Sequence, residues 1–151
     1  SFGGDPNQIY LSGHSSGAHL AAVALTADWE KEFELPADII KGAVLISGIY
    51  DLKPVRLSAR SSYVNLTDDI ENRLSPQRHL QNLATPVSLV YGTDESPEFI
   101  RQTKDFADAL AKGGKSVELL VGSGYNHFEI LETLASPFGI SGRALTAQMT
   151  S

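Results

Sequence analysis

Ser15 is the residue of this chain whose surroundings point most directly to chemistry. It stands at the centre of Gly13-His14-Ser15-Ser16-Gly17, which fits the pattern Gly-x-Ser-x-Gly, with a β-like run at 9–12 and a helix-forming run at 18–25. A strand that turns sharply into a helix strains the central serine and exposes its Oγ, while the flanking glycines let strand and helix approach closely. The pattern therefore predicts a nucleophile; a chance turn rich in glycine and serine is the simpler alternative.

A nucleophilic serine needs a general base, and the chain offers four histidines. His14 lies inside the turn and His19 on the following helix, so we expect packing or polar-network roles for both. His79 falls in a polar segment and is expected at the surface. His127 follows the apolar run 117–121 and a short turn. In folds that place a nucleophilic serine between a strand and a helix, the histidine lies in a loop after the last strand. We therefore predict that His127 is the base.

The acid that would orient this base is predicted near the end of another apolar run. Asp94 and Glu95 stand side by side just after Gly92. The acid usually comes three residues after such a glycine, which favours Glu95, whereas Asp94 has the commoner residue type. Asp94 could instead cap the next helix, and Glu95 could be a helix N-terminal charge. We favour Glu95, keep Asp94 as the alternative, and regard Asp51, after an earlier strand, as a weaker candidate.

Three segments together resemble a known family. Residues 13–21, 95–102 and 127–132 are similar to the serine, acid and histidine segments of the kynurenine formamidase-like branch of α/β-hydrolases. The similarity extends over most of the chain, and the three segments occur in the family's order.

The resemblance implies that Ser15 is the nucleophile, His127 the base and position 95 the acid. The family typically has aspartate at position 95, so Glu95 is a departure that keeps Asp94 in question. Members of this branch, and the neighbouring hormone-sensitive-lipase-like esterases, hydrolyse small esters or N-formyl arylamines without a metal. We therefore expect no cofactor and no metal.

The elements that must position these residues alternate between strand and helix. We predict an α/β fold, specifically the C-terminal half of an α/β-hydrolase fold, with a mostly parallel sheet and flanking helices. Trp29 is expected to close a helix and to have a structural role. The predicted strands are 8–12, 41–47, 86–91 and 116–121, and the predicted helices are 16–27, 98–112, 128–135 and 141–149.

Residues 50–83 are the least regular part of the chain, with prolines, a serine-rich patch and an acidic pair. Such a fold inserts substrate-covering excursions after its strands, so this segment is expected to be a cap or pocket wall. A plain surface connection with apolar anchors is the alternative. The predicted pocket residues are Tyr50, Leu52, Val55, Leu57, Tyr63 and Tyr125, and packing of the histidine loop is the alternative for Tyr125.

A serine that attacks a carbonyl also needs hydrogen-bond donors that stabilise the oxyanion formed in the reaction. The backbone N–H of Ser16 would supply one donor, and a second normally comes from a loop before the serine turn. We therefore expect residues 1–151 to be the C-terminal part of a single domain. Its N-terminal strands and oxyanion loop would then belong to a separate chain or to a further segment.

Composition narrows the class of protein. The 151 residues are 42% hydrophobic and 20% charged, carry a net charge of −6 and include no cysteine. This is an ordinary globular composition without a membrane-spanning run, and its charge disfavours nucleic acid and anionic membranes as partners. The absence of cysteine excludes disulfides and thiolate metal sites. We expect a cytoplasmic location, a small-molecule ester or amide as substrate, and allow for a homo-oligomer.

The predicted function is a serine hydrolase that cleaves small carboxylic esters or N-formyl and aryl amides through an acyl-enzyme. A carboxylesterase or arylformamidase-like enzyme is the favoured form. Two other functions fit the same fold. One is a catalytically silent binding module, and the other is a serine peptidase or acyltransferase.

Overall fold

The computed structural model describes residues 3–150. Within that range four strands form one parallel sheet in the order β1-β2-β3-β4. The strands are β1 (Ile9–His14), β2 (Ile40–Ile46), β3 (Val87–Gly92) and β4 (Val117–Gly122). Because all four strands run parallel, their carboxyl ends lie at the same edge of the sheet, and each strand is joined to the next by a crossover connection. The loops that carry Ser15, Glu95 and His127 leave from this edge.

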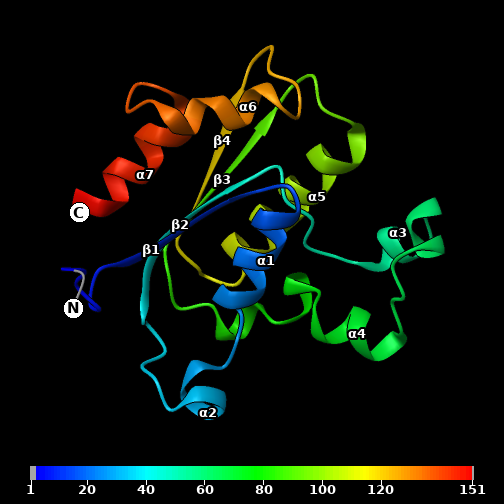
Figure 1. The fold of residues 1–151 in the computed structure, drawn as a ribbon, viewed down its shortest axis with the longest axis horizontal. Helices are drawn as coiled ribbons and strands as arrows, with labels where there is room; N and C mark the ends of the chain where they lie inside the picture. The colour runs from blue at the N-terminus through cyan, green and yellow to red at the C-terminus, as the bar shows by residue number, and fades with distance from the viewer. Residues whose placement is uncertain (1–2, 151) are drawn as a thin grey trace.

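Helices cover both faces of the sheet (Figure 1). The first face is covered by α1 (Ser16–Leu25) and α5 (Pro97–Lys112), and the second by the short α6 (Glu129–Glu132) and by α7 (Ile140–Thr150). β2, an inner strand of the sheet, packs against helices on both faces. Ala43 and Leu45 pack with α1 and α5, while Val44 and Ile46 pack on the α6–α7 side. A strand buried on both faces must be apolar at successive positions, which is why this segment shows no alternation.

Local sequence signals account for the ends of the main helix on the first face. Pro97 begins α5, where its missing N–H costs nothing, and Gly113 follows its last residue. Phe106 and Leu110, one turn apart, are both fully buried against the sheet. No helix in residues 3–150 is long and apolar enough to cross a membrane.

The sequence predicted these elements closely. Each predicted strand overlaps an observed one, and α1, α5 and α7 confirm three predicted helices. The predicted helix 128–135 divides into α6 and a 3₁₀ helix, η4 (Thr133–Ala135). Trp29 has the expected structural role, since it packs against the core, but its predicted place at a helix end was wrong, because α1 ends at Leu25 and Trp29 begins the separate helix α2 (Trp29–Phe33). The reason is a cap: the side chain of Asp28 accepts a hydrogen bond from the backbone N–H of Lys31.

The excursion between β2 and β3 consists of short helical elements that project to one side of the sheet (Figure 1). Its α-helices are α3 (Lys53–Arg56) and α4 (Asp68–Arg73). Its 3₁₀ helices are η1 (Ala59–Ser62), η2 (Pro76–Arg78) and η3 (Leu80–Asn82).

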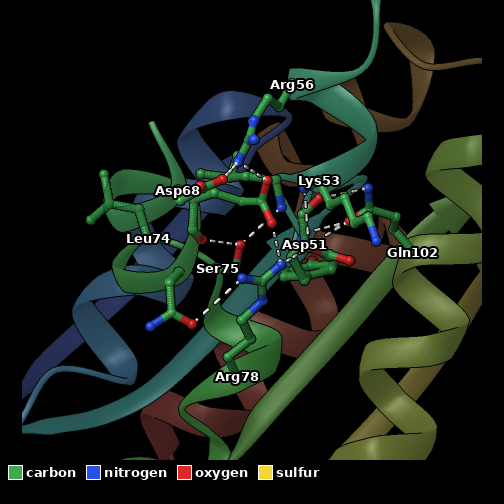
Figure 2. A network of polar contacts seen from close by, with 12 residues as sticks. Asp51, Lys53, Arg56, Asp68, Leu74, Ser75, Arg78 and Gln102 are labelled. Atoms are coloured by element: carbon green, nitrogen blue, oxygen red, sulfur yellow. Dashed lines mark hydrogen bonds and ion pairs between the residues drawn. The ribbon is translucent and has the colours of Figure 1, made fainter. Parts of the chain in front are cut away.

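A polar network holds this excursion in place (Figure 2). The buried carboxylate of Glu71 lies 3.0 Å from Arg56 Nη1 and 2.6 Å from Arg78 Nη2. Arg78 also pairs with Asp51, at 3.2 Å. The side-chain oxygen of Gln102, on α5, accepts hydrogen bonds from the backbone N–H groups of Tyr50 and Asp51. The excursion is therefore tied both to itself and to the helix that follows β3.

Candidate active site

Ser15 occupies the turn between β1 and α1 in a conformation that serine rarely adopts, with φ 55° and ψ −116°. Its backbone N–H donates to the carbonyl of Ile46 on the neighbouring strand, at 2.9 Å. A backbone held in a sparsely populated region stores strain, and such strain is commonest at functional sites.

The two glycines of the turn have different structural roles. A Cβ at Gly13 would lie 2.4 Å from the carbonyl oxygen of Gly17, so only glycine lets β1 and α1 come this close. Outside its chain neighbours and its own helix backbone, a Cβ at Gly17 would meet no heavy atom of residues 3–150 within 4 Å. The expectation that both glycines avoid a clash therefore holds for Gly13 and is wrong for Gly17.

His127 lies between Ser15 and Glu95 and is hydrogen-bonded to both. Its Nε2 is 3.0 Å from Ser15 Oγ, and its Nδ1 is 2.7 Å from Glu95 Oε2. A carboxylate can only accept a hydrogen bond, so the proton of this bond is on Nδ1, which donates to Glu95. The other nitrogen is then free to accept the Ser15 proton, which is the arrangement that a general base requires. The His127 side chain is 18% exposed, so a reacting group can reach it.

Glu95 is held from both of its oxygens. Its side chain is fully buried. Oε1 accepts hydrogen bonds from the Ser47 hydroxyl at 2.5 Å and from the Gly92 backbone N–H at 2.7 Å. Hydrogen bonds to a charged acceptor are short and strong, so they fix the carboxylate with Oε2 directed at the imidazole.

The two other candidate acids lie elsewhere. Asp94 is exposed, and its carboxylate accepts a hydrogen bond from the hydroxyl of Thr93, at 3.0 Å. It does not cap α5, whose N-cap residue is Ser96. Asp51 belongs to the network of the excursion through Arg78. Neither carboxylate contacts His127 in the part of the chain that the structure describes.

The remaining histidines join polar contacts of the fold. His19 Nε2 lies 2.7 Å from the carbonyl oxygen of Leu74, and His79 Nε2 lies 2.8 Å from that of Asn72. His14 donates from Nε2 to the carbonyl oxygen of His127 itself, at 2.6 Å. Burial is the main cause of a lowered pKa at His14, and repulsion from His127 adds to it. The hydrogen bond to the His127 carbonyl opposes this shift.

Aromatic rings support the imidazole of His127. The ring of Phe99, from α5, stacks on it with a centroid distance of 4.1 Å. Phe128 meets it edge-on at 5.5 Å, and the His14 ring lies tilted at 4.5 Å. These neighbours restrict the rotation of the imidazole, because a packed ring cannot turn without displacing them.

Ser16 is the first residue of α1, a helix of ten residues. The first N–H groups of a helix lack intrahelical acceptors and lie at its positive end, so they favour negative charge.

Two hollows that share lining residues reach the neighbours of Ser15 and His127, although neither lining includes those two residues themselves. The first, of about 180 Å³, reaches Phe99, which stacks on His127. It is lined by Ile49, Pro54, Val55, Ser58, Arg60, Glu98, Phe99 and Gln102. The second, of about 210 Å³, reaches Ser16. It is lined by Ser16, His19, Ile49, Leu52, Val55, Arg60, Val64, Leu66 and Leu74. The excursion supplies most of both linings.

The structure separates the residues predicted to contact a substrate. Leu52 lines the second hollow, and Val55 lines both. Tyr50 lines neither, because its ring is 1% exposed and stacks on Phe106 in the core. Tyr63, 74% exposed, also lies outside both linings.

Two further residues named for the pocket lie outside both linings, and for Tyr125 this agrees with the alternative of packing in its loop. Tyr125 lines neither hollow, because its loop runs back along the end of β3, where its carbonyl oxygen accepts the N–H of Asp94. Leu57 also lies outside both linings, and its side chain is exposed.

The sequence did not identify the contacts of three residues that surround Ser15, Glu95 and His127. Ser47 follows the end of β2 with φ 51°, and its hydroxyl donates to Glu95. The Ser-Gly pair at 47–48, directly after a buried strand, was a sequence signal that could have indicated this residue. His14 was expected in a packing or polar-network role, which its hydrogen bond to the His127 carbonyl confirms, but the sequence did not identify that partner. Phe99 lies one turn into α5, and no local pattern distinguishes it from other helix residues. In residues 3–150 no group of three or more His, Cys, Asp or Glu side chains is arranged to hold a metal ion.

The fold and this geometry define a class of α/β protein in which a strained serine follows a strand of a parallel sheet and meets a histidine and an acid from later loops. The model of the alpha/beta hydrolase fold family matches residues 1–131. The chain belongs to this family.

Individual relatives show the same similarity. Kynurenine formamidase of Danio rerio is 37% identical over 131 residues, which cover 83% of this chain and 44% of that protein. Isoprenylcysteine alpha-carbonyl methylesterase ICME of Arabidopsis thaliana is 32% identical over 150 residues, which cover 85% of this chain and 35% of that protein. The chain thus spans less than half the length of these two curated relatives.

Solved structures resemble it as well. A thermophilic esterase from the Planctomycetes species Thermogutta terrifontis matches with a TM-score of 0.63 and 25% identity, over 85% of this chain and 49% of that one. Acylaminoacyl peptidase of Pyrococcus horikoshii matches with a TM-score of 0.68 and 22% identity, over 92% of this chain and 23% of that one. At that identity the peptidase establishes a common fold only.

Proposed function

We propose that this protein is a serine hydrolase that cleaves small carboxylic esters or N-formyl aryl amides through an acyl-enzyme. In this proposal Ser15 is the nucleophile, His127 the general base and Glu95 the acid that orients it. The observation that carries the proposal is the continuous hydrogen-bond chain from Ser15 Oγ through the imidazole to the buried carboxylate. The similarity to a kynurenine formamidase and to a methylesterase supports amides and esters as the two substrate classes.

The first half of the reaction forms the acyl-enzyme. Ser15 Oγ attacks the substrate carbonyl while its proton passes to His127 Nε2. The N–H of Ser16 would donate to the oxyanion, and removing one such donor costs about 2.7–4 kcal/mol in other enzymes. The tetrahedral intermediate then expels the alcohol or amine, which takes the proton from His127. Glu95 stabilises the imidazolium that exists between these two transfers.

The second half returns the enzyme to its starting state. A water molecule attacks the acyl-enzyme while His127 accepts its proton. The acid departs as Ser15 Oγ recovers that proton, so the net reaction consumes one water molecule. The base must be oriented in both halves, and this accounts for an acid whose carboxylate is held on each side.

The excursion supplies the wall of the proposed substrate pocket. Its residues Leu52, Val55 and Val64 give the second hollow an apolar lining next to Ser16. Apolar walls beside a few polar groups are typical of sites for small molecules. A short acyl chain or an aryl ring would fit their chemistry.

The test uses the full-length protein with 4-nitrophenyl acetate, N-formylkynurenine and a peptide anilide as substrates. We expect turnover of the ester or the formamide and covalent labelling of Ser15 by a fluorophosphonate. Ser15→Ala should keep the thermal unfolding transition and lower kcat by roughly 10⁴- to 10⁶-fold. Activity that survives this substitution would exclude the covalent route, and hydrolysis of the anilide alone would indicate a peptidase.

A further inference from the structure

Arg60 stands at the junction of the two hollows, which reach Ser16, next to Ser15, and Phe99, stacked on His127. It lines both of them, together with Ile49 and Val55. It belongs to η1, whose start is fixed by the Ser58 side chain, since the Ser58 hydroxyl oxygen accepts the backbone N–H of Arg60 at 3.2 Å. The backbone that carries this arginine is therefore anchored, while its long side chain remains exposed.

The guanidinium of Arg60 has no hydrogen-bond or ion-pair partner among residues 3–150. The nearby arginines differ in this respect. Arg56 and Arg78 both pair with Glu71 in the network of the excursion (Figure 2), and Arg101 pairs with Glu98 and Asp105. Arg60 thus keeps all of its donors available, in a chain whose net charge is −6.

No free anion of the two linings competes for this charge within residues 3–150. Glu98 is the acidic residue in the first lining, and its carboxylate already accepts from Arg101 and from Gln102. The hydrogen bonds from Arg101 are the largest cause of the lowered pKa of Glu98. In the second lining His19 is engaged with the carbonyl of Leu74. The remaining lining residues near Arg60 are largely apolar.

We propose that Arg60 binds an anionic group of the substrate, so that the preferred substrates carry a carboxylate beside an apolar portion. This inference rests on the proposed hydrolase function and assigns a substrate class to that same site. A guanidinium offers a planar fork of donors that matches a carboxylate with two parallel hydrogen bonds. The neighbouring apolar walls would take the alkyl or aryl part, and the anion would fix which way the scissile carbonyl faces Ser15.

The test compares substrates that differ only in the anion, with the full-length protein. One pair is mono-4-nitrophenyl glutarate and 4-nitrophenyl valerate, which place or omit a carboxylate on the acyl side. The other is N-formylanthranilate and N-formylaniline, which do so on the amine side. The measured quantity is the ratio of kcat/KM for the anionic member to that for the neutral member. Arg60→Gln should lower this ratio about tenfold for at least one pair, the size expected for a hydrogen bond to a charged group.

Two further variants separate this role from a general effect of charge. Arg60→Lys keeps the charge and loses the fork, so its ratio should fall between those of the wild type and Arg60→Gln. Arg143→Gln removes an exposed arginine from α7, outside both linings, and should leave the ratio unchanged. If Arg60→Gln leaves both ratios unchanged, or if Arg143→Gln lowers them equally, the inference is overturned.

A binding experiment keeps this inference separate from the proposed function. In the Ser15→Ala background, calorimetry gives the Kd of N-formylanthranilate and of N-formylaniline without any turnover. Adding Arg60→Gln should raise the Kd of the anionic compound about tenfold relative to that of the neutral one. An unchanged ratio of Kd values would refute the role of Arg60 even in an active hydrolase. A wild-type protein that hydrolyses nothing, yet shows this change in Kd, would refute only the hydrolase.

Discussion

The carboxylate of Glu95 lies 2.7 Å from Nδ1 of His127, while the other nitrogen of the same ring faces Ser15 Oγ. Glu95 lies in the loop after β3, and His127 lies in the loop after β4. These two strands are paired in register, with Gly92 opposite Gly122. The distance between acid and histidine is thus set by the pairing of two strands, and the loops add only a few residues on each side.

Replacing Glu95 by Gln tests whether the carboxylate orients the base. The amide keeps the shape of the side chain but removes the charge, and its NH₂ group can oppose the N–H at Nδ1. We expect kcat to fall by roughly 10³- to 10⁴-fold, as when an orienting acid is neutralised elsewhere. Steady-state kinetics and a thermal melt of the same variant measure the two effects separately.

Asp94→Asn is the matched control for this change. It neutralises the neighbouring carboxylate, which contacts Thr93 and not the imidazole within residues 3–150. We expect kcat within about twofold of the wild type, because exposed hydrogen bonds contribute little. If Asp94→Asn proved the more damaging of the two, the assignment of the acid to Glu95 would be wrong.

Ser47 provides a second and more subtle test of the same carboxylate. Ser47→Ala removes the hydroxyl that donates to Glu95 Oε1, so the carboxylate keeps only the Gly92 N–H on that side. The loss of a hydrogen bond to a charged group predicts about a tenfold decrease in kcat. Stopped-flow measurement of acyl-enzyme formation would detect it directly.

Ser47→Gly distinguishes the hydroxyl from the backbone. Ser47 has φ 51°, which glycine adopts without strain, so the glycine variant should unfold at a higher urea concentration than the alanine variant. Both variants lack the hydroxyl and should lose kcat alike. A glycine variant with wild-type kcat would show that backbone strain, and not the hydrogen bond, explains the alanine result.

The sequence was sufficient for the parts of the site that depend on chain order. Ser15, an acid near position 95 and His127 each follow a predicted strand, and parallel strands end at one edge of a sheet. The offset of three residues from Gly92 also favoured Glu95, and the structure adds a reason. At this offset the side chain can turn back and accept the N–H of Gly92 itself.

The remaining parts depend on contacts between segments that are far apart in the chain. His14 and His127 are separated by 113 positions, and Ser47 and Glu95 by 48, so no local pattern links them. Tyr50 shows the opposite failure. From the sequence, an aromatic residue just after a strand can belong either to a pocket or to the core. Only the stacking of Tyr50 on Phe106 in the structure assigns it to the core. Pocket walls built by irregular segments are therefore the least predictable feature.

His14 predicts a specific dependence of stability on pH. Burial lowers its pKa in the folded protein below the ordinary 6.5 of the unfolded chain. The unfolded state therefore binds protons first, so the stability that His14 contributes is complete above about pH 6.5 and is lost as the pH falls toward the folded pKa. His14→Gln keeps an N–H donor and cannot titrate. Urea denaturation between about pH 5 and 7.5 should give a smaller decrease in the free energy of unfolding for this variant. If the free energy of unfolding changed equally with pH in the variant and the wild type, His14 would not cause the loss of stability at low pH.

Gly13 and Gly17 offer a matched pair in the serine turn, since Ala at each position adds the same methyl group. At Gly13 the new Cβ would lie 2.4 Å from the carbonyl oxygen of Gly17 and 2.8 Å from the backbone nitrogen of Ala18. Backbone atoms cannot rotate away, so α1 must move from β1 and carry Ser15 with it. We expect Gly13→Ala to cost about 1–3 kcal/mol of stability and to lower kcat, because a displaced hydroxyl no longer meets His127.

Gly17→Ala should behave differently. Its Cβ enters space that is open within residues 3–150, and alanine favours the helix that Gly17 helps to begin by up to about 1 kcal/mol. The melting temperature of this variant should equal or exceed that of the wild type. Differential scanning calorimetry and kcat, measured side by side for the two variants, check both expectations. If the two substitutions destabilised the protein equally, the cause would be a general intolerance of the turn to methyl groups, and the close approach at Gly13 would not explain its glycine.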